Sequence, residues 1–305
     1  MSDCHFDLLT FAYVYSKNEK LNYFKKYCES VINPVNINSG ILNFYFLNKK
    51  KMKSDLNIDM NENSPINLVK CSIDILRKNT NINLNQFILG IEGFEYFNIS
   101  NLDLLYKIGI RAITITWNFN NKYASGVLGD NQKLTTKGKK LIKKLIDLNM
   151  IIDLSHIGEN SFFDIIDICH KERKKGKNPI VIASHSNSYT LTKNKRNLTD
   201  MQLKVLKSIN GYVGVVTYAD FCTITSNLKK DFITHLEYIN NIMGSKNIFI
   251  SSDDLSLDPS VTLNKSVFKH SKFIEIKDLL KEKFNSEDIN NIILNNFNYI
   301  KKVVK

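Results

Sequence analysis

The chain contains few of the residues that interrupt regular structure and no long apolar segment. Among 305 residues there are 4 prolines and 12 glycines, so long flexible linkers between separate domains are not expected. No run of about 18 apolar residues occurs, which predicts no membrane-spanning helix and no membrane partner. The first residues lack the basic stretch and apolar core of a signal peptide, so we expect a cytoplasmic protein.

Cysteine is also scarce, and its pattern disfavours small domains that are stabilised by disulfides or by a zinc ion. The five cysteines are odd in number and widely separated, and no two form a Cys-x-x-Cys pair. This argues against a disulfide framework and against a zinc knuckle, and it favours a reducing compartment.

Basic residues outnumber acidic ones, with 42 Lys and Arg against 30 Asp and Glu, which gives a formal net charge of +12. Nucleic-acid-binding proteins gather basic residues into patches with aromatics or glycines. Here lysines are spread over most of the chain, and the densest runs, 49–53 and 171–177, are short. We interpret them as solvated faces and predict no nucleic-acid partner, while a weak attraction for anionic substrates stays open.

Hydrophobic residues make up 43% of the chain, enough for a large core, and apolar β-branched runs recur along it. Continuous apolar runs are typical of strands buried on both faces, as in a parallel sheet. The eight predicted strands are Asp3–Leu9, Ile41–Leu47, Phe87–Glu92, Ala112–Thr116, Ile151–Leu154, Ile180–Ser184, Tyr212–Val216 and Ile248–Ser252.

Amphipathic stretches with helical spacing separate these runs, and Ser64 and Pro65 suit the start of the first. Strands alternating with helices predict an α/β fold, a (β/α)8 TIM barrel that forms a single domain over residues 1–305. A doubly wound open sheet is the alternative. The predicted helices are Pro65–Asn79, Thr136–Asn149, Thr199–Ile209, Phe232–Met243 and Ser286–Val304.

Histidines and carboxylates recur where the predicted strands end. In a barrel, the carboxyl ends of all strands meet on one face, where active sites lie. Histidine and carboxylate side chains are ligands for divalent metals. The pattern therefore predicts a metal-dependent hydrolase. The candidates are His5 and Asp7 on the first strand, Glu92 on the third, His156 after the fifth, His185 after the sixth and Asp253 after the eighth.

These segments, taken in order and at suitable spacing, resemble the membrane dipeptidase (renal dipeptidase) family of the amidohydrolase superfamily over nearly the whole chain. The first resembles the family's opening Asp-x-His-x-Asp and the second its Gly-Val-Glu-Gly. The resemblance is carried by Asp3–Leu8, Gly90–Gly93, Leu105–Arg111, Asp153–His156, Ser184–Ser186, Lys195–Asn197, Ser252–Asp253 and Asn296–Phe297.

The resemblance implies a cofactor of two divalent metal ions, usually Zn²⁺. By analogy, His5 and Asp7 would bind one metal, His156 and His185 the other, and Glu92 would bridge them. A hydroxide held between two metals about 3.5–4 Å apart would attack the peptide bond of a dipeptide-like substrate. The resemblance also suggests a homodimer.

Two further residues acquire roles from the same resemblance. Asp253 would accept the proton of the attacking water and pass it to the leaving amine. Strand alternation points only one of Asp253 and Asp254 inward, and the Ser-Asp match favours Asp253. Arg196 would bind the substrate's terminal carboxylate, since its planar fork can contact both oxygens; a solvated charge is the competing interpretation.

The sequence departs from the family at Trp117, where the family usually has a histidine that stabilises the tetrahedral intermediate. Losing one such donor typically lowers kcat about 10²–10³-fold. We therefore predict that Trp117 reshapes the substrate pocket, and that Trp117 and the adjacent Asn118 contact the substrate. A second departure is Asp254–Ser256, where the family commonly has Phe-Asp-Gly, and the loop that follows looks short.

Three functions compete. The first is a zinc-dependent dipeptidase. The second, prompted by Trp117, is hydrolysis of another amide, such as an N-acyl amino acid or a lactam. The third, prompted by Trp117 and Leu255, is a weakened or non-catalytic barrel that keeps its metal for a binding role.

Overall fold

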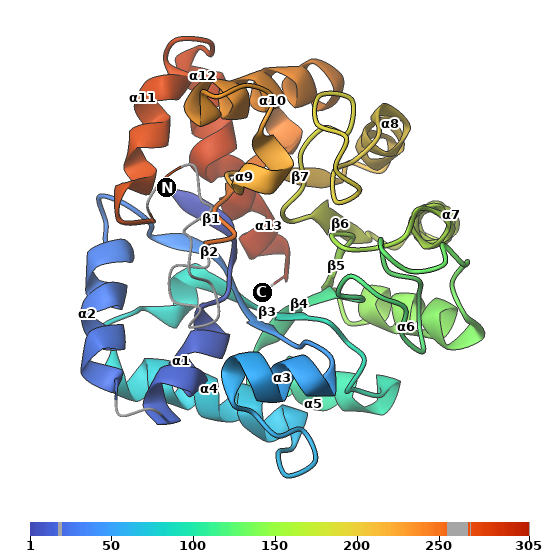
Figure 1. Ribbon diagram of the computed structural model, residues 1–305. Helices are drawn as coiled ribbons and strands as arrows, with labels where there is room; N and C mark the ends of the chain where they lie inside the picture. The colour runs from blue at the N-terminus through green and yellow to red at the C-terminus, as the bar shows by residue number, and fades with distance from the viewer. Residues whose placement is uncertain (18–19, 255–267, 269, 305) are drawn as a thin grey trace.

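The computed structural model describes residues 1–17, 20–254, 268 and 270–304. Eight parallel strands form one sheet in the order β1 to β8, and the last strand lies beside the first, so the sheet curls into a nearly closed (β/α)8 barrel (Figure 1). The fold prediction is confirmed. The strands are β1 Ser2–Phe6, β2 Ser39–Tyr45, β3 Phe87–Glu92, β4 Ile110–Thr114, β5 Ile151–Asp153, β6 Ile180–Ala183, β7 Tyr212–Val216 and β8 Ile248–Ser251.

Each of the eight predicted runs overlaps a strand, but the first run was predicted to extend too far. β1 ends at Phe6 and a helix begins at Leu8, so Asp7 lies in the link rather than on the strand. The apolar run continues through Leu8 and Leu9 into the helix, and a short apolar run does not distinguish strand from helix.

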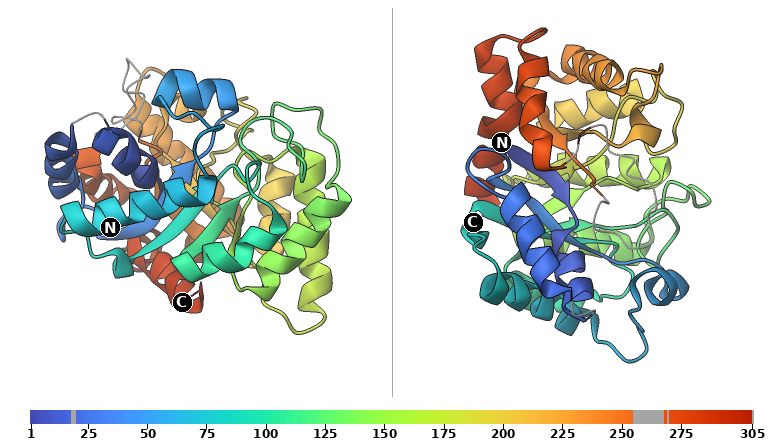
Figure 2. Two further views of the ribbon diagram at one scale, coloured as in Figure 1. Left: turned by 90° about the horizontal axis from the view of Figure 1, so that it is seen from below. Right: turned by 60° about the vertical axis from the view of Figure 1, so that its left-hand side comes forward.

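Helices surround the sheet (Figure 2), and all five predicted helices are present. The segment predicted as one helix over 286–304 contains a π-helical turn, η5 (Asn291–Asn295). The α-helices are α1 Leu8–Lys17, α2 Leu21–Val31, α3 Lys49–Leu56, α4 Pro65–Asn79, α5 Leu102–Ile108, α6 Thr136–Asp147, α7 Glu159–Arg173, α8 Asp200–Ser208, α9 Ala219–Cys222, α10 Leu228–Met243, α11 Ile276–Leu280, α12 Ser286–Asn290 and α13 Asn296–Val304.

The N-termini of α8 and α4 differ in whether a side chain caps them by a hydrogen bond. Thr199 caps α8, since its hydroxyl accepts the Gln202 N–H at 3.3 Å while the Gln202 side chain accepts the Thr199 N–H at 2.9 Å. Ser64 occupies the N-cap position of α4, with Pro65 in the first turn as expected. The Ser64 side chain, however, makes no capping hydrogen bond within the described part of the chain.

Helix α13 closes the amino end of the barrel. Its apolar side chains Phe297, Ile300 and Val304 join the cluster that fills the barrel interior, and its Asn296 amide donates to the backbone oxygens of Ser245 and Ile248 at the start of β8. In Figure 1 this helix lies across the centre of the ring. The interior cluster also contains Cys4, Ile41, Ile88, Ala112, Ile151, Ile180, Ile182 and Phe249.

Side chains join the two ends of the sheet. The Asp3 carboxylate on β1 accepts the backbone N–H of Ser252 at 2.9 Å and its hydroxyl at 2.5 Å. One residue further on, the Asp253 N–H donates to the His5 oxygen at 3.2 Å. The first and last strands are therefore fixed together next to the residues predicted to form the site.

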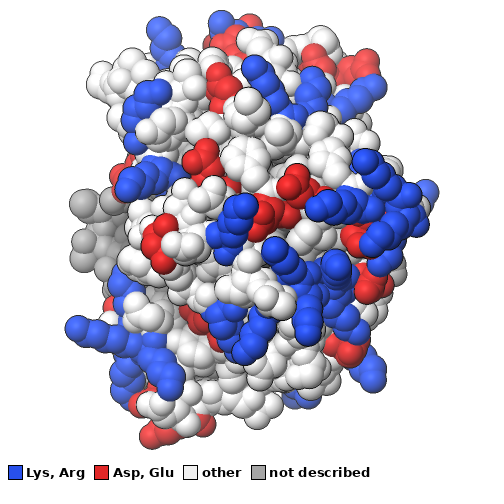
Figure 3. Space-filling view, turned by 90° about the vertical axis from the view of Figure 1, so that its right-hand side faces the viewer, with Lys and Arg blue, Asp and Glu red and all other residues white. Residues whose placement is uncertain are grey.

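Basic side chains are spread over the face shown in Figure 3, with acidic side chains between them. Among the ion pairs of the described residues, the Lys177 ammonium lies 2.6 Å from Asp147 and 2.9 Å from Glu172. Within the described ranges, none of the helices combines the length and apolar character needed to cross a membrane.

The His235 side chain on α10 forms hydrogen bonds with the segment 186–198, which leads from β6 to α8. Its ring is fully buried, its Nδ1 accepts the Ser188 N–H at 3.1 Å, and its Nε2 lies 3.1 Å from the Thr192 hydroxyl. Burial lowers the pKa of His235 from 6.5 to about 4. The folded protein therefore favours the neutral ring.

We predict that this histidine makes the protein less stable in acid. Because its pKa is lowered on folding, the unfolded chain binds more protons between pH 6.5 and about 4, so the unfolding free energy falls there by at most about 3 kcal/mol. Urea unfolding above pH 6.5 and near pH 4 should show a smaller pH dependence for His235→Gln than for the wild type. Equal pH dependence would contradict the assignment.

Candidate active site

The carboxylate of Glu92, at the end of β3, lies between histidines from three other strand ends. Its Oε2 is 3.1 Å from His5 Nε2, and its Oε1 is 2.6 Å from His156 Nε2 and 3.9 Å from His185 Nε2. The two oxygens thus face two different histidine groups. Glu92 is 3% exposed, so this carboxylate has been removed from water and faces charge or polar partners on both sides.

The sequence-predicted ligands form three overlapping groups whose ligand atoms lie within 4.8 Å of one another. One group is His5, Asp7 and Glu92, and a second is Glu92, His156 and His185. The third joins His5 and His185 to Asp253. The fold therefore brings together all six residues that the strand-end pattern singled out.

Local backbone geometry aims several of these side chains. The register between β1 and β2 shifts between Asp3 and Phe6, a β-bulge that contains His5. His156 and Asp253 have φ angles of 65° and 47°, in the left-handed region that non-glycine residues seldom adopt. Such strain is concentrated at functional sites, where the surrounding fold holds it in place.

The donor set fits a cation. His156 Nδ1 lies 2.8 Å from the Asn118 amide oxygen, an acceptor, so the ring proton sits on Nδ1 and Nε2 carries a lone pair. That lone pair faces His185 Nε2 at 2.9 Å and a Glu92 oxygen at 2.6 Å. Neutral histidine nitrogens and a carboxylate directed at one point are the arrangement that a divalent metal requires.

Burial and neighbouring charge shift the pKa values of the histidines in opposite directions. Burial lowers the pKa of His156 to about 4, helped by Arg196, and holds the pKa of His185 well below its usual value. Burial acts the same way on His5, but Glu92 and Asp7 outweigh it and raise its pKa well above the usual range.

The carboxyl groups differ as well. Burial alone would raise the pKa of Glu92, but His156 and His5 outweigh it and hold this pKa well below its usual value. Burial raises the pKa of Asp7 to about 7 and that of Asp253 to about 6. A carboxyl group with a raised pKa can exchange a proton near neutral pH.

The two adjacent aspartates after β8 point in different directions. Asp253 takes part in the His5 and His185 group and lines the pocket in front of it, whereas the Asp254 carboxylate accepts a hydrogen bond from Tyr27 on α2 at 3.4 Å. Leu255 and Ser256, at which the sequence departs from the family, and the rest of the loop 255–267 lie outside the described residues.

A cavity of about 390 Å³ lies in front of these groups. Arg196 is 7% exposed and lines it; its Nε and Nη2 have no hydrogen-bond partner among the described residues, and burial lowers its pKa to about 10. The cavity is also lined by Asp7, Tyr45, Leu47, Lys51, Asp55, Glu92, Trp117, Asn118, Leu128, His156, Asn194, Tyr218, Asp220, Phe221 and Asp253.

Trp117 forms one wall of this cavity. Its ring stacks on His156, with centroids 5.9 Å apart and 26° between the planes, and the Lys51 ammonium lies 5.2 Å from the centre of the indole. Asn118, predicted as a substrate contact, lines the same cavity and also holds His156 through its amide. No pattern of residues marked Lys51, which lies on the lysine-rich helix α3.

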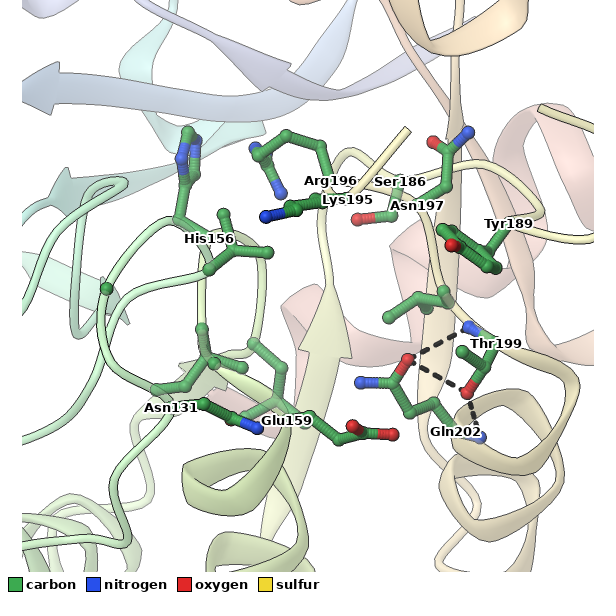
Figure 4. A pocket seen from close by; sticks show the side chains of 16 residues that line it. Asn131, His156, Glu159, Ser186, Tyr189, Lys195, Arg196, Asn197, Thr199 and Gln202 are labelled. Carbon is green, nitrogen blue, oxygen red and sulfur yellow. Dashed lines mark hydrogen bonds between the residues drawn. The ribbon is translucent and has the colours of Figure 1, made fainter. Parts of the chain in front are cut away.

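A second cavity of about 400 Å³ adjoins the first, and His156 and Arg196 line both. It lies between the segments that follow β5 and β6, and polar side chains including Asn131, Glu159, Tyr189 and Gln202 surround it (Figure 4).

Sequence reasoning missed two residues beneath the site. Asp153 ends β5 and Ser184 follows β6, and both are bonded to each other next to the histidines. Both stood in the motifs that carried the family resemblance: Ser184 directly precedes His185, and Asp153 lies three residues before His156. Only their position before a candidate ligand could have marked them.

A (β/α)8 barrel with histidines and carboxylates gathered at the carboxyl ends of its strands has the architecture of the barrel metallohydrolases. The chain belongs to the membrane dipeptidase family (peptidase family M19), whose family model matches residues 49–305. His5 and Asp7 precede the matched range, so their place in the site rests on the geometry of β1.

Two relatives illustrate the similarity in sequence. A protein from the pqqA 5′ region of Klebsiella pneumoniae is 34% identical over 177 residues, which is 53% of this chain and 62% of the relative. The dipeptidase C965.12 of Schizosaccharomyces pombe is 30% identical over 201 residues, 63% of this chain and 46% of the relative. The chain thus matches about half to three-fifths of these relatives' lengths.

Solved structures agree on the fold. A metallopeptidase from Rhodobacter sphaeroides, bound to a phosphinate mimic of the dipeptide L-Ala-D-Ala, gives a TM-score of 0.78 at 16% identity, covering 100% of this chain and 99% of that one. The probable dipeptidase PvdM from Pseudomonas aeruginosa gives 0.66 at 16% identity, covering 88% and 86%.

The donor set predicts that a divalent cation stabilises the protein. A cation that binds only the folded state should raise the unfolding free energy by about 2.7 kcal/mol at about 100 times its Kd. Thermal melting with and without Zn²⁺ measures this, and a chelator should reverse it. Glu92→Gln, which keeps the side chain's shape but removes its charge, should lose most of the shift; an equal shift in this variant would contradict the site.

Proposed function

We propose that the protein is a metal-dependent dipeptidase that hydrolyses the peptide bond of a dipeptide or a dipeptide-like amide. The observation that carries the proposal is the position of Glu92, whose two oxygens face two separate histidine groups at 3.1 and 2.6 Å. An acid–base residue, Asp253, and a buried cation, Arg196, line the same cavity.

Two divalent ions suit this arrangement, with His5 and Asp7 as ligands on one side, His156 and His185 on the other, and Glu92 shared. The chemistry of the donors, three imidazoles and two carboxylates, favours Zn²⁺. Bound there, the ions would supply Lewis-acid activation of the carbonyl and of water.

Asp253 is the proposed proton carrier. Burial raises its pKa to about 6, so it is mostly ionised at neutral pH and can take a proton from the attacking water. The same carboxyl group, once protonated, can donate to the departing amine. Its strained φ of 47° directs it toward His5 and His185 instead of following the course of β8.

Arg196 is the proposed anchor for the substrate's terminal carboxylate. Its buried guanidinium has two nitrogens without a partner in the described part of the chain, and a buried charge is stabilised when a ligand of opposite charge pairs with it. A carboxylate can accept two of its N–H groups at once. A free carboxylate next to the scissile bond is the mark of a dipeptide.

Trp117 supports a second candidate within the same chemistry, a specialised amide in place of ordinary dipeptides. Its indole covers His156 and provides a flat apolar wall where the family usually has a polar donor. A substrate with an aromatic or otherwise apolar acyl group would pack there. The third possibility, a non-catalytic barrel, has less support because the described ligand groups are complete.

Hydrolysis of a dipeptide panel, by protein loaded with Zn²⁺, tests the proposal. We expect chelator-sensitive turnover that falls by at least about 10²-fold in Asp253→Asn, since the proton carrier is lost. Zinc content measured on the same samples is the control and should stay near that of the wild type. Turnover of the wild type that Asp253→Asn leaves unchanged would contradict the role of Asp253.

Substitution at Trp117 separates the two substrate classes. If Trp117 limits activity on plain dipeptides, Trp117→His should raise kcat on them by up to about 10²–10³-fold, since it restores a donor near the developing charge. Trp117→Phe, which stays aromatic but has no ring donor, is the matched control and should bring no gain. A wild type already as fast as Trp117→His on dipeptides would remove the case for a specialised amide.

A further inference from the structure

Beneath the proposed cation site, Asp153 accepts four hydrogen bonds. Its Oδ2 accepts the hydroxyls of Thr114 at 2.7 Å and Ser184 at 2.6 Å, and its Oδ1 accepts the backbone N–H groups of Ser155 at 3.0 Å and Ser184 at 2.9 Å. Asp153 is 3% exposed and Ser184 1%. The Ser184 side chain is therefore fixed by an ionic acceptor that water hardly reaches.

The Ser184 oxygen also touches one histidine from each group. His185 Nδ1 lies 2.8 Å from it and His5 Nδ1 3.1 Å. A hydroxyl has one proton and two lone pairs. Because a carboxylate can only accept, the proton goes to Asp153. The two lone pairs are left for the nearest donors, the two rings, while the Ser155 hydroxyl lies farther from the Ser184 oxygen, at 3.3 Å.

This proton arrangement sets the state of both rings. A neutral ring with its proton on Nδ1 presents an Nε2 lone pair on the side of Glu92, at 3.1 Å in His5 and 3.9 Å in His185. In His5, a bound cation would replace the second proton that Glu92 and Asp7 favour there. A metal needs that tautomer, and an acceptor on the far nitrogen both fixes it and holds the ring's orientation.

We propose that Ser184, held by Asp153, is a shared positioning residue that sets the tautomer and orientation of His5 and His185, one ligand from each of the two cation positions. The inference rests on the proposed cation site. Its consequence is that loss of this one hydroxyl would weaken cation binding at both positions, although Ser184 is not itself one of the proposed ligands.

The side chain of Asn43 offers the competing arrangement. Its amide nitrogen lies 3.1 Å from His5 Nδ1, close enough because Gly90, on the neighbouring strand, has no side chain: a Cβ there would lie 2.1 Å from the Asn43 amide oxygen. If that nitrogen donates, His5 carries its proton on Nε2, and only His185 depends on Ser184. With the amide turned to present its oxygen, Asn43 and Ser184 accept the same proton.

Zinc binding by the whole chain distinguishes the two arrangements. Titration of the metal-free protein against a chromogenic chelator yields an affinity for each ion, and elemental analysis gives the number bound. For Ser184→Ala we expect both affinities to fall by about 10–100-fold. Asp153→Asn should act similarly, because its amide N–H can donate to the Ser184 oxygen and occupy a lone pair that a histidine needs.

Two variants act as controls. Ser186→Ala removes a hydroxyl that is equally buried and adjacent to His185, but that has no hydrogen-bond partner among the described residues, so both affinities should stay at the wild-type value. Ser184→Thr keeps the hydroxyl and should recover most of the affinity that Ser184→Ala loses. Thermal melting of the metal-free proteins shows whether each variant is folded. If Ser184→Ala does not fold, Asp153→Asn, which preserves the shape of the side chain, provides the test instead.

The zinc-binding results test the role of Ser184 separately from the proposed dipeptidase activity. A loss confined to one ion, unchanged affinities, an equal loss in Ser186→Ala, or a wild type that binds fewer than two ions would overturn the shared role of Ser184. The proposed function would be contradicted if the wild type binds two ions and hydrolyses no dipeptide. The role of Ser184 would still stand if both affinities fall in Ser184→Ala.

Discussion

The buried carboxylate of Glu92 is the interaction on which the arrangement of this molecule depends. A carboxylate taken out of water is strongly unfavourable unless opposite charge and hydrogen bonds replace the water. Here that compensation comes from His5, His156 and His185, which belong to strand ends far apart in the sequence. They meet around one carboxylate because the strands are parallel and the sheet curves into a ring, so that the strand ends face one another.

The two ends of that ring have different physical characters. At the amino end, apolar side chains of α13 pack into the strand interior and exclude water, which makes the base rigid. At the carboxyl end the interior is polar, and the loops there supply Trp117, Arg196 and Asp253. Substrate preference can therefore change through the loops while the base and the Glu92 cluster remain, and Trp117 is such a change.

The sequence predicted the barrel and every member of the histidine and carboxylate groups, because strand-end residues gather by topology alone. It misplaced the end of β1, since the apolar run passes from Phe6 through Leu8 into a helix. Strand alternation alone did not decide whether Asp253 or Asp254 faces inward, because that depends on a left-handed φ that alternation does not include; the Ser-Asp match had favoured Asp253. The support from Ser184 required distances between segments that no spacing rule connects.

The bonds between Asp3 and Ser252 join residues 249 positions apart, and this separation matters before the protein is complete. On a ribosome adding about 5–20 residues per second, β1 waits roughly 12–50 s for the strand that covers its open edge. An unpaired strand edge is a template for association with other chains. Until β8 is made, the edge of β1 that does not face β2 stays open, and a temporary cover such as a chaperone would keep nascent chains from pairing with one another.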